Sequence, residues 1–312
     1  MSGSWEDIAN EVVPDGTASS GLATGARRGA SLPSSVDEWA SGDGFLSRPK
    51  TPRVVPCPQI GSQAKLDEVL NGQVQSVVGH GDYYQIEIAP LDWDAEYASL
   101  ASRLKAVLAA EKFPRLSGVQ LPELLFMDIE TTGLSSSGPL FLIGCLWFER
   151  GVETPHLELF LARDYDEEGA VLAAFHRRAR GKTLITFNGH AFDWPFIEGR
   201  SSRLGLQFSQ PRGHMDLLFA SRRTWRSKLP NCRLQTLESF ICGRAREGDV
   251  PSSRIPATYE RWLEGHGAHL LAPVAHHNAL DVLTMAELLC FLGEGQTWRD
   301  RWSDQSTLGA DS

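Results

Sequence analysis

The feature of this chain that most constrains its fold is an apolar run that contains two acidic residues. Residues 124–134 read LLFMDIETTGL, and the pattern predicts a buried strand with Asp128 and Glu130 two positions apart. Side chains alternate between faces along a strand, so both carboxylates point to the same face. Two like charges partly removed from water cost on the order of several kcal/mol unless cations neutralise them or they lie at an exposed strand end. Residues 131–133 (TTG) end the strand directly afterwards, so the pair lies at a carboxyl end, where open sheets place ligand crevices.

Composition and charge limit the class of protein. The 312 residues are 42% hydrophobic and 22% charged, which is typical of a globular chain with one large domain or two smaller ones. The net charge of −9 excludes a protein that coats nucleic acid through its overall charge, so any such contact needs a local basic surface. The cysteines are odd in number and widely spaced, which predicts free thiols rather than disulfides. They are Cys57, Cys145, Cys232, Cys242 and Cys290.

The chain carries no recognisable targeting or membrane segment. Its first residues, MSGSWEDIANEVV, lack a basic stretch followed by an apolar one, so a secretory signal is not expected. The most apolar stretch, PLFLIGCLWF at 139–148, is far shorter than the roughly 20 residues that cross a bilayer. These observations predict a soluble, cytoplasmic protein with no membrane partner.

Composition shifts divide the chain into four parts. Residues 14–56 are rich in Gly, Ser, Ala, Thr and Pro and have little periodic apolar content, and the whole segment 1–56 is predicted to be a disordered linker. Residues 57–121 predict a small extension: the runs QVQSVV and YYQIEIA form two strands around a GHGD turn, and 94–111 form an amphipathic helix. The main domain spans 122–292, and 293–312 is predicted to be a flexible tail.

The main domain has the pattern of an α/β fold. Three runs, ELLFMDIE, PLFLIGCLWF and HLELFLAR, predict consecutive strands, and a helix, the strand TLITFNG and another helix follow. Further helices are expected at HMDLLFASRRTW, LQTLESFICG and SRIPATYERWLEGHG, and the last is APVAHHNALDVLTMAELLCFL at 272–292. This order predicts a mixed sheet with helices on both faces.

Two further acidic residues stand at suggestive positions. Asp193 follows the TLITFNG strand near the start of a helix, with Asn188 and His190 in the turn before it. Its alternative role is that of a first-turn residue favoured by the helix dipole. Asp281 lies in the last apolar helix, and His277 shares its face at a spacing of four. The alternative for that pair is a buried structural hydrogen bond.

The four carboxylates in this order resemble the DEDD superfamily of exonucleases, which has the ribonuclease H-like fold. The closest resemblance is to the YprB-like ribonuclease H-like domains of bacteria. It is carried by DIETTGL, the FNGHAFDWPF block, HMDLL, the L-x-x-L-E of 234–238 and HNALD, and it covers 122–292. The resemblance implies an α/β, ribonuclease H-like mixed five-stranded sheet flanked by helices, with the hairpin-and-helix extension at its amino-terminal side.

The resemblance also implies an activity: a 3′–5′ exonuclease that hydrolyses phosphodiester bonds with two Mg²⁺ or Mn²⁺ ions. Carboxylates are the hard oxygen ligands that such ions prefer. Asp128 would bridge both ions, Glu130 and Asp281 would hold one of them, and Asp193 would act largely through water. A histidine would orient or deprotonate the attacking water.

Either of two adjacent histidines is a candidate for that role. His276 stands five residues before Asp281, the offset of the superfamily branch with a catalytic histidine, and His277 stands four before it. An offset of five turns His276 about 140° away from Asp281 on an ideal helix. His276 would therefore have to precede the helix on a bend, for which Pro273 is well placed. The H-N-x-x-D register of YprB-like domains favours His277.

The predicted partner is nucleic acid, either DNA or RNA. The segment 221–246 carries several basic residues against one acid, Glu238, and Trp225 among them would either stack on a base or pack beneath them. A merely solvated basic face is the alternative. The basic residues are Arg222, Arg223, Arg226, Lys228, Arg233, Arg244 and Arg246. Two other functions stay open: a non-catalytic nucleic-acid-binding or scaffold module, and a metal-dependent phosphoesterase acting on a small nucleotide.

Overall fold

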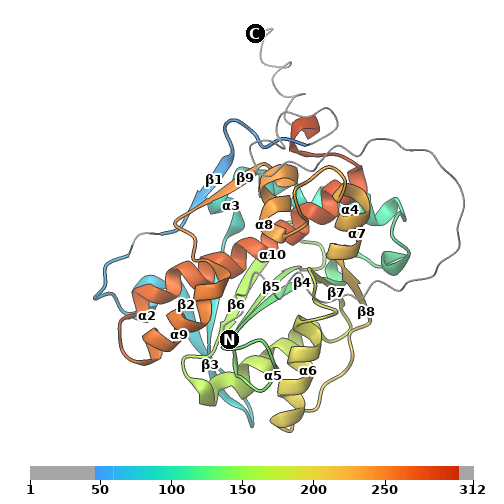
Figure 1. Ribbon diagram of the computed structural model, residues 1–312. Coiled ribbons are helices and arrows are strands. Elements are labelled where there is room, and N and C mark those ends of the chain that lie inside the picture. Colours follow the sequence, from blue (N-terminus) through green and yellow to red (C-terminus); the bar gives the residue numbers. More distant parts are fainter. Residues whose placement is uncertain (1–45, 59, 302–312) are drawn as a thin grey trace, which may run out of the picture.

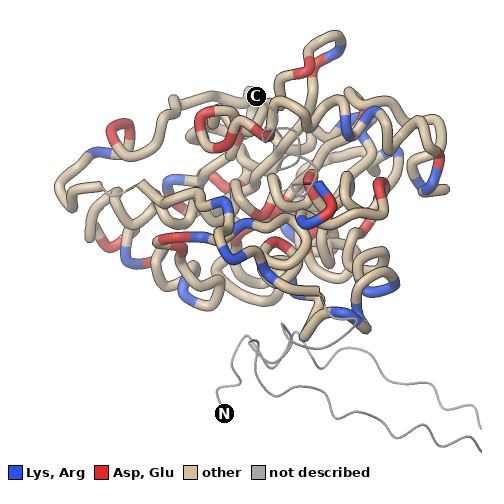
Figure 2. The backbone as a smooth tube through the Cα atoms, turned by 90° about the horizontal axis from the view of Figure 1, so that it is seen from above, with Lys and Arg blue, Asp and Glu red and all other residues tan. Residues whose placement is uncertain are grey.

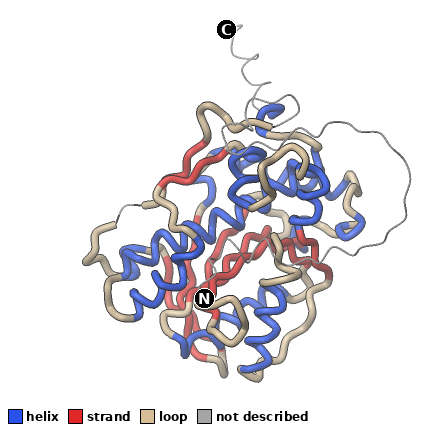
Figure 3. The backbone as a smooth tube through the Cα atoms, in the orientation of Figure 1, coloured by secondary structure: helices blue, strands red, loops and turns tan. Residues whose placement is uncertain are grey.

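The structure is a computed structural model that describes residues 46–58 and 60–301. Its centre is one mixed sheet of seven strands in the order β2-β3-β6-β5-β4-β7-β8 (Figures 1 and 3). The strands are β2 (Gly72–Val77), β3 (Gly81–Ile88), β4 (Leu124–Thr131), β5 (Leu140–Phe148), β6 (Pro155–Leu161), β7 (Thr183–Thr186) and β8 (Gly213–Asp216). β4, β7 and β8 run parallel, and the other neighbours are antiparallel. The carboxyl ends of β4, β7 and β8 therefore meet at one edge of the sheet.

Helices cover both faces of the sheet. α5 and α6 lie on one face, and α10 crosses the other, where it packs on β4 and β5 and contacts α4 and α7 (Figure 1). The helices are α2 (Leu66–Val69), α3 (Pro90–Trp93), α4 (Leu100–Ala109), α5 (Glu168–Ala179), α6 (Asp193–Arg203), α7 (Leu217–Trp225), α8 (Leu234–Leu237), α9 (Ile255–Leu263) and α10 (Leu271–Glu294). Most side chains of α10 are buried, as expected for a helix that is apolar nearly all round. The predicted α/β fold with a mixed sheet and helices on both faces is thus confirmed.

The predicted amino-terminal hairpin is present but belongs to the main sheet. β3 pairs antiparallel with β6, in a register that places Ile86 opposite Leu159, so the sheet has seven strands rather than five. Tyr84 and Ile86 of β3 are buried in the common core. The pairing satisfies backbone groups that β6 would otherwise leave at an open edge.

The prediction of a disordered linker over 1–56 was wrong for its last residues. Residues 1–45 lie outside the described residues, but Arg53–Pro56 form β1, which pairs in parallel with β9 (Arg244–Glu247). Arg53 makes ion pairs with Asp94 at 2.6 Å and with Glu287 at 2.7 Å. These pairs connect β1 to the buried side of α10.

Two other boundaries differ from the sequence prediction. The HMDLL segment was expected to be helical, but its first three residues close β8, and α7 begins at Leu217. The tail expected from 293 starts inside α10, and residues 302–312 lie outside the described residues. Within the described part of the tail, Trp298 donates to the Ser47 carbonyl at 3.1 Å and Arg301 pairs with Glu96 at 2.8 Å.

Three general properties follow from the described residues. No helix among them is long and apolar enough to cross a membrane. All five cysteines are free thiols, as predicted. Acidic and basic residues are interspersed along the described backbone rather than separated into two halves (Figure 2).

The ion pairs of Arg53 generate a stability prediction. Arg53→Met leaves the buried Glu287 carboxylate with one cationic partner fewer, so the free energy of unfolding should fall by about 1.5–3 kcal/mol. Lys105→Met is the matched control, because Lys105 and its partner Glu153 are both more than half exposed and such pairs contribute about 1 kcal/mol or less. Urea unfolding of both variants measures the difference, and equal losses would contradict the structural role assigned to β1.

Candidate active site

A pocket of about 200 Å³ opens at the carboxyl end of β4. It brings together all four predicted carboxylates and one of the two predicted histidines. Its lining residues are Asp128, Ile129, Glu130, Thr131, Phe187, Asn188, Phe192, Asp193, Ser252, Pro256, His277 and Asp281.

The strand β4 presents Asp128 and Glu130 on the same face, as its alternation predicts. Both are partly exposed, whereas Ile129 between them is buried. The amide Nδ2 of Asn278 on α10 donates a hydrogen bond to Asp128 Oδ2 at 2.8 Å. Gly144 of β5, which is paired with Asp128, makes this approach possible, because a Cβ there would lie 2.0 Å from Asn278 Oδ1.

The turn before α6 positions Asp193. Asn188 in this turn has a φ of +66°, a left-handed conformation that asparagine tolerates better than most residues. The backbone N–H groups of Asn188 and His190 donate to the two carboxylate oxygens of Asp216, at 2.8 and 3.1 Å. Asp216 also caps α7 by accepting from the Leu218 N–H at 3.0 Å. Asp216 therefore both caps α7 and supports the turn that precedes Asp193.

The helix α10 separates the two histidines. It is continuous from Leu271, with Pro273 in its first turn, so the bend that would bring His276 to the pocket is absent from this described segment. His276 is 3% exposed, and its ring centre lies 5.1 Å from that of Trp93, in a different pocket. Burial lowers the pKa of His276 to about 4. His277 lines the carboxylate pocket, on the face predicted for it.

Four polar groups surround the ring of His277, and one of them is the Arg246 guanidinium, whose Nη1 lies 3.5 Å from Nδ1. Nδ1 lies 2.9 Å from Asp249 Oδ1, while Nε2 lies 3.4 Å from Asp281 Oδ2 and 3.2 Å from the Ser252 hydroxyl. Burial opposes the charged form, but the charge of Asp281 and the contact with Asp249 outweigh it and raise the pKa of His277 well above its usual value. This arrangement therefore favours the protonated imidazole.

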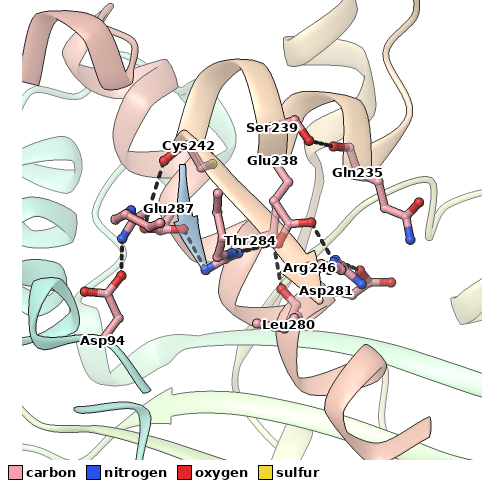
Figure 4. Close-up of polar contacts among 12 residues, drawn as sticks. Asp94, Gln235, Glu238, Ser239, Cys242, Arg246, Leu280, Asp281, Thr284 and Glu287 are labelled. Carbon is pink, nitrogen blue, oxygen red and sulfur yellow. Dashed lines mark hydrogen bonds and ion pairs between the residues drawn. The ribbon is translucent and has the colours of Figure 1, made fainter. Parts of the chain in front are cut away.

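Asp281 is neutralised by a second cation, Arg246. One guanidinium nitrogen of Arg246 pairs with Asp281 Oδ1, and Nε pairs with Glu238 at 2.6 Å (Figure 4). Burial disfavours the carboxylate, but Arg246 and then His277 overcome this and lower the pKa of Asp281. Asp281 is thus ionised and paired, unlike the other three acids of the pocket.

The pair extends into a buried chain of charges. Glu238 Oε1 accepts from Arg244 Nε at 2.7 Å, and Arg244 Nη1 lies 3.0 Å from Glu287 Oε2. Glu287 in turn pairs with Arg53, so alternating charges connect β1 to Asp281. Arg244 is fully buried, which is tolerable only because each part of its guanidinium has a partner.

The other three carboxyl groups of the pocket repel one another. Burial, followed by the charges of Asp281, Asp193 and Glu130, raises the pKa of Asp128 well above its usual value. Burial is also the largest cause that raises the pKa of Glu130 to about 8 and that of Asp193 to about 7. The pocket therefore carries more potential negative charge than its own cations neutralise.

This donor set fits Mg²⁺ or Mn²⁺ by its chemistry. Several hard carboxylate oxygens with raised pKa values face one pocket, and a divalent cation would relieve their repulsion. In the present side-chain positions, no three His, Cys, Asp or Glu residues among those that the structure describes are close enough together to hold one metal ion. Ions would have to draw the carboxylates together and to compete with Arg246 for Asp281.

Comparison with known proteins defines the class. A family model described as the RNase H superfamily matches residues 125–292, which are 168 of the 312 residues. The chain therefore belongs to the RNase H superfamily. Within it, the chain carries a YprB-like ribonuclease H-like domain, as its motifs predicted: it is 33% identical over 177 residues to the Bacillus subtilis (strain 168) protein named uncharacterized protein YprB.

The matched regions cover only part of each relative. The alignment with YprB includes 55% of this chain and 42% of that protein, so the chain matches less than half the length of its relative. Among solved structures, the family B DNA polymerase of the archaeon Pyrobaculum calidifontis is 16% identical. It covers 55% of this chain and 26% of the polymerase chain, with a TM-score of 0.41.

Four polar residues of the site were not predicted from the sequence. Arg246 lies in β9, a strand that the pattern did not indicate, Asp249 follows that strand, and Ser252 begins the next short 3-10 helix. Asn278 was part of the HNALD motif, but no role was assigned to it. Of the four, Asn278 was the one for which the sequence carried a signal, because it is a polar residue between His277 and Asp281 in an otherwise apolar helix.

The raised pKa values generate a pH prediction for the metal-free protein. In the unfolded chain Glu130 ionises near pH 4, whereas the folded protein holds its proton to about pH 8. Between these values the folded state binds more protons, so Glu130 lowers stability as the pH rises. The free energy of unfolding of Glu130→Gln should thus exceed that of wild type by a margin that grows from pH 5 to pH 8 by on the order of 1–3 kcal/mol.

Urea unfolding in EDTA across this pH range measures the effect. Glu149→Gln, an exposed position in the turn after β5, is the matched control. An advantage of Glu130→Gln that does not change with pH would contradict the account of buried, mutually repelling carboxyl groups.

Proposed function

We propose that the protein is a metal-dependent nuclease that hydrolyses phosphodiester bonds of DNA or RNA, as a 3′–5′ exonuclease with two divalent ions. The observation that carries the proposal is the convergence of Asp128, Glu130, Asp193 and Asp281 on one pocket beside His277. Membership of the RNase H superfamily supports nuclease chemistry. The 3′ polarity and the use of two ions rest on the resemblance to DEDD exonucleases.

The four carboxylates are the residues that would hold Mg²⁺ or Mn²⁺. Such ions, when bound, supply activation of a water molecule and neutralisation of charge on the scissile phosphate. The protein's own contribution is to hold the carboxylates on rigid elements: β4 for Asp128 and Glu130, the start of α6 for Asp193, and α10 for Asp281. The contact from Asn278 fixes one oxygen of Asp128 and leaves the other for a ligand.

His277 is the group that would move the proton. The contact with Asp249 holds a proton on Nδ1. Nε2, which lies beside Asp281 in the pocket, is therefore the nitrogen that would accept and release a proton. The charge of Asp281 keeps the pKa of His277 high in the present arrangement. Neutralisation of that charge lowers the pKa toward the range in which imidazole accepts a proton from water.

One observation favours a second candidate, a non-catalytic nucleic-acid-binding or scaffold module. Asp281 is already neutralised by Arg246 and His277, so it does not need a cation. The two functions differ in their response to metal. A nuclease cleaves labelled oligonucleotides in Mg²⁺ or Mn²⁺ and loses this activity in EDTA. A non-catalytic module cleaves them under neither condition. Inclusion of a nucleoside monophosphate ester tests the small-nucleotide phosphoesterase in the same assay.

The first prediction from the proposed function concerns Asp128. Asp128→Asn removes the central carboxylate of the pocket, so the cleavage rate should fall by at least about 10²–10³-fold, as when one electrostatic stabiliser is lost. Asp166→Asn, an exposed residue in the loop before α5, is the matched control and should cleave normally. Rates on single- and double-stranded DNA and RNA measure the effect, and full activity of a folded Asp128→Asn protein would refute the proposal.

The second prediction separates the two histidines. His277→Ala should lose about 10²–10⁴-fold in rate, the usual contribution of a general base. His276→Ala should lose little rate, because its ring lies against Trp93 outside the pocket. Rates of both variants at saturating Mg²⁺ decide the assignment, and the reverse ranking would give the role to His276.

A further inference from the structure

Helix α7 has one exposed face that carries an aromatic ring and three arginines. Arg222, Arg223 and Arg226 stand three, four and seven residues after Phe219. Arg226 is the C-cap of α7 and keeps helical backbone angles, so all four lie along one side of the helix. Phe219 is 61% exposed, an unusual state for a large apolar side chain in a helix. Trp225 is 3% exposed and packs in the core. Of the two aromatic residues in α7, Phe219 is therefore the one available to a partner.

The positive charge of this face is not used inside the protein. Within the described residues, none of the three arginines has an acidic partner at ion-pair distance. Arg244 and Arg246 of the same basic segment differ, because both are held in ion pairs. Exposed cations beside an exposed ring, in a chain of net charge −9, complement a polyanion with stackable groups.

The face begins at the wall of the carboxylate pocket. Asn188 lines the pocket, and two residues later the ring of His190 lies 6.4 Å, centre to centre, from that of Phe219. Asp216, the cap of α7, holds the backbone of this same turn. The turn at residues 188–190 therefore lies between the pocket and the end of this face that carries Phe219.

We propose that the exposed face of α7, formed by Phe219, Arg222, Arg223 and Arg226, binds single-stranded nucleic acid next to the pocket. The arginines contact phosphates, and Phe219 stacks on a base. Stacking requires an unpaired base, so the face favours a single strand over a duplex. The orientation of the strand toward the pocket rests on the proposed nuclease function, whereas the binding itself does not require cleavage.

The test measures binding of the full chain in EDTA, where no metal-dependent cleavage occurs. Fluorescence anisotropy follows labelled single strands of about 20 nucleotides, in separate DNA and RNA arms, across a range of NaCl concentrations. The variant R222A/R223A/R226A should bind more weakly, and the slope of log affinity against log salt should decrease by about 2, since each phosphate contact on a single strand contributes about 0.7.

The matched control removes three charges elsewhere. Arg150, Arg180 and Arg203 are exposed and lie away from α7: Arg150 follows β5, Arg180 follows α5, and Arg203 is the last residue of α6. R150A/R180A/R203A has the same net charge as the α7 variant, so any difference between them reports the location of the charges. Equal affinity and equal salt slope for the two triple variants would overturn the proposal.

A single substitution tests the stacking contact. Phe219→Ala should weaken binding of the single strand by roughly 10-fold, within the range measured for one stacked base, and Phe219→Trp should restore it. Heparin, a polyanion without bases, should bind Phe219→Ala and wild type equally. If Phe219→Ala binds the single strand as tightly as wild type, or if duplex binds as tightly as single strand, the assignment of a stacked base is wrong.

The binding and cleavage results are separable. Wild type that binds through α7 but cleaves nothing in Mg²⁺ or Mn²⁺ would refute the proposed function and leave the surface intact. If wild type cleaves and the α7 variant binds as tightly as wild type, the proposed binding surface is refuted and the proposed nuclease function stands.

Discussion

The buried ion pair between Arg244 and Glu238 is the interaction on which the arrangement around the pocket depends. A guanidinium without access to water is costly unless it is paired, and loss of one partner from such a pair costs about 3–5 kcal/mol. Arg244 lies on β9, Glu238 begins the short π-helical segment that follows α8, and both contact Thr284 of α10. This pair thereby fixes three elements together, and it leaves the second oxygen of Glu238 to orient Arg246 toward Asp281.

The pocket that results is electrostatically uneven. Asp281 is surrounded by Arg246 and His277, whereas burial and the neighbouring acids raise the pKa values of Asp128, Glu130 and Asp193. The acidic groups that lack a paired cation therefore lie on β4 and at the start of α6. Once these groups ionise they would repel a phosphate group, so a cation between them and the phosphate would favour its approach.

The sequence predicted those parts of the fold that repeat a local pattern. The D-x-E alternation placed both carboxylates on one face of β4, and the spacing of four placed His277 beside Asp281. The pairing of β1 with β9 was not predictable, because four-residue strands carry little periodicity and their partners lie about 190 residues apart. Arg246 was read as part of a basic surface for the same reason: its partners Glu238, Asp249 and Asp281 come from three separate segments.

Gly144 shows how far the influence of the pocket extends into the sheet. It contributes no atom to the pocket lining, yet any larger residue there would displace the amide of Asn278 and with it the hydrogen bond to Asp128. The two positions are therefore not free to vary independently. A relative with a side chain at the position of Gly144 must also carry a smaller residue at the position of Asn278. Such a coupled change would identify, from sequences alone, the family members that position the residue equivalent to Asp128 in a different way.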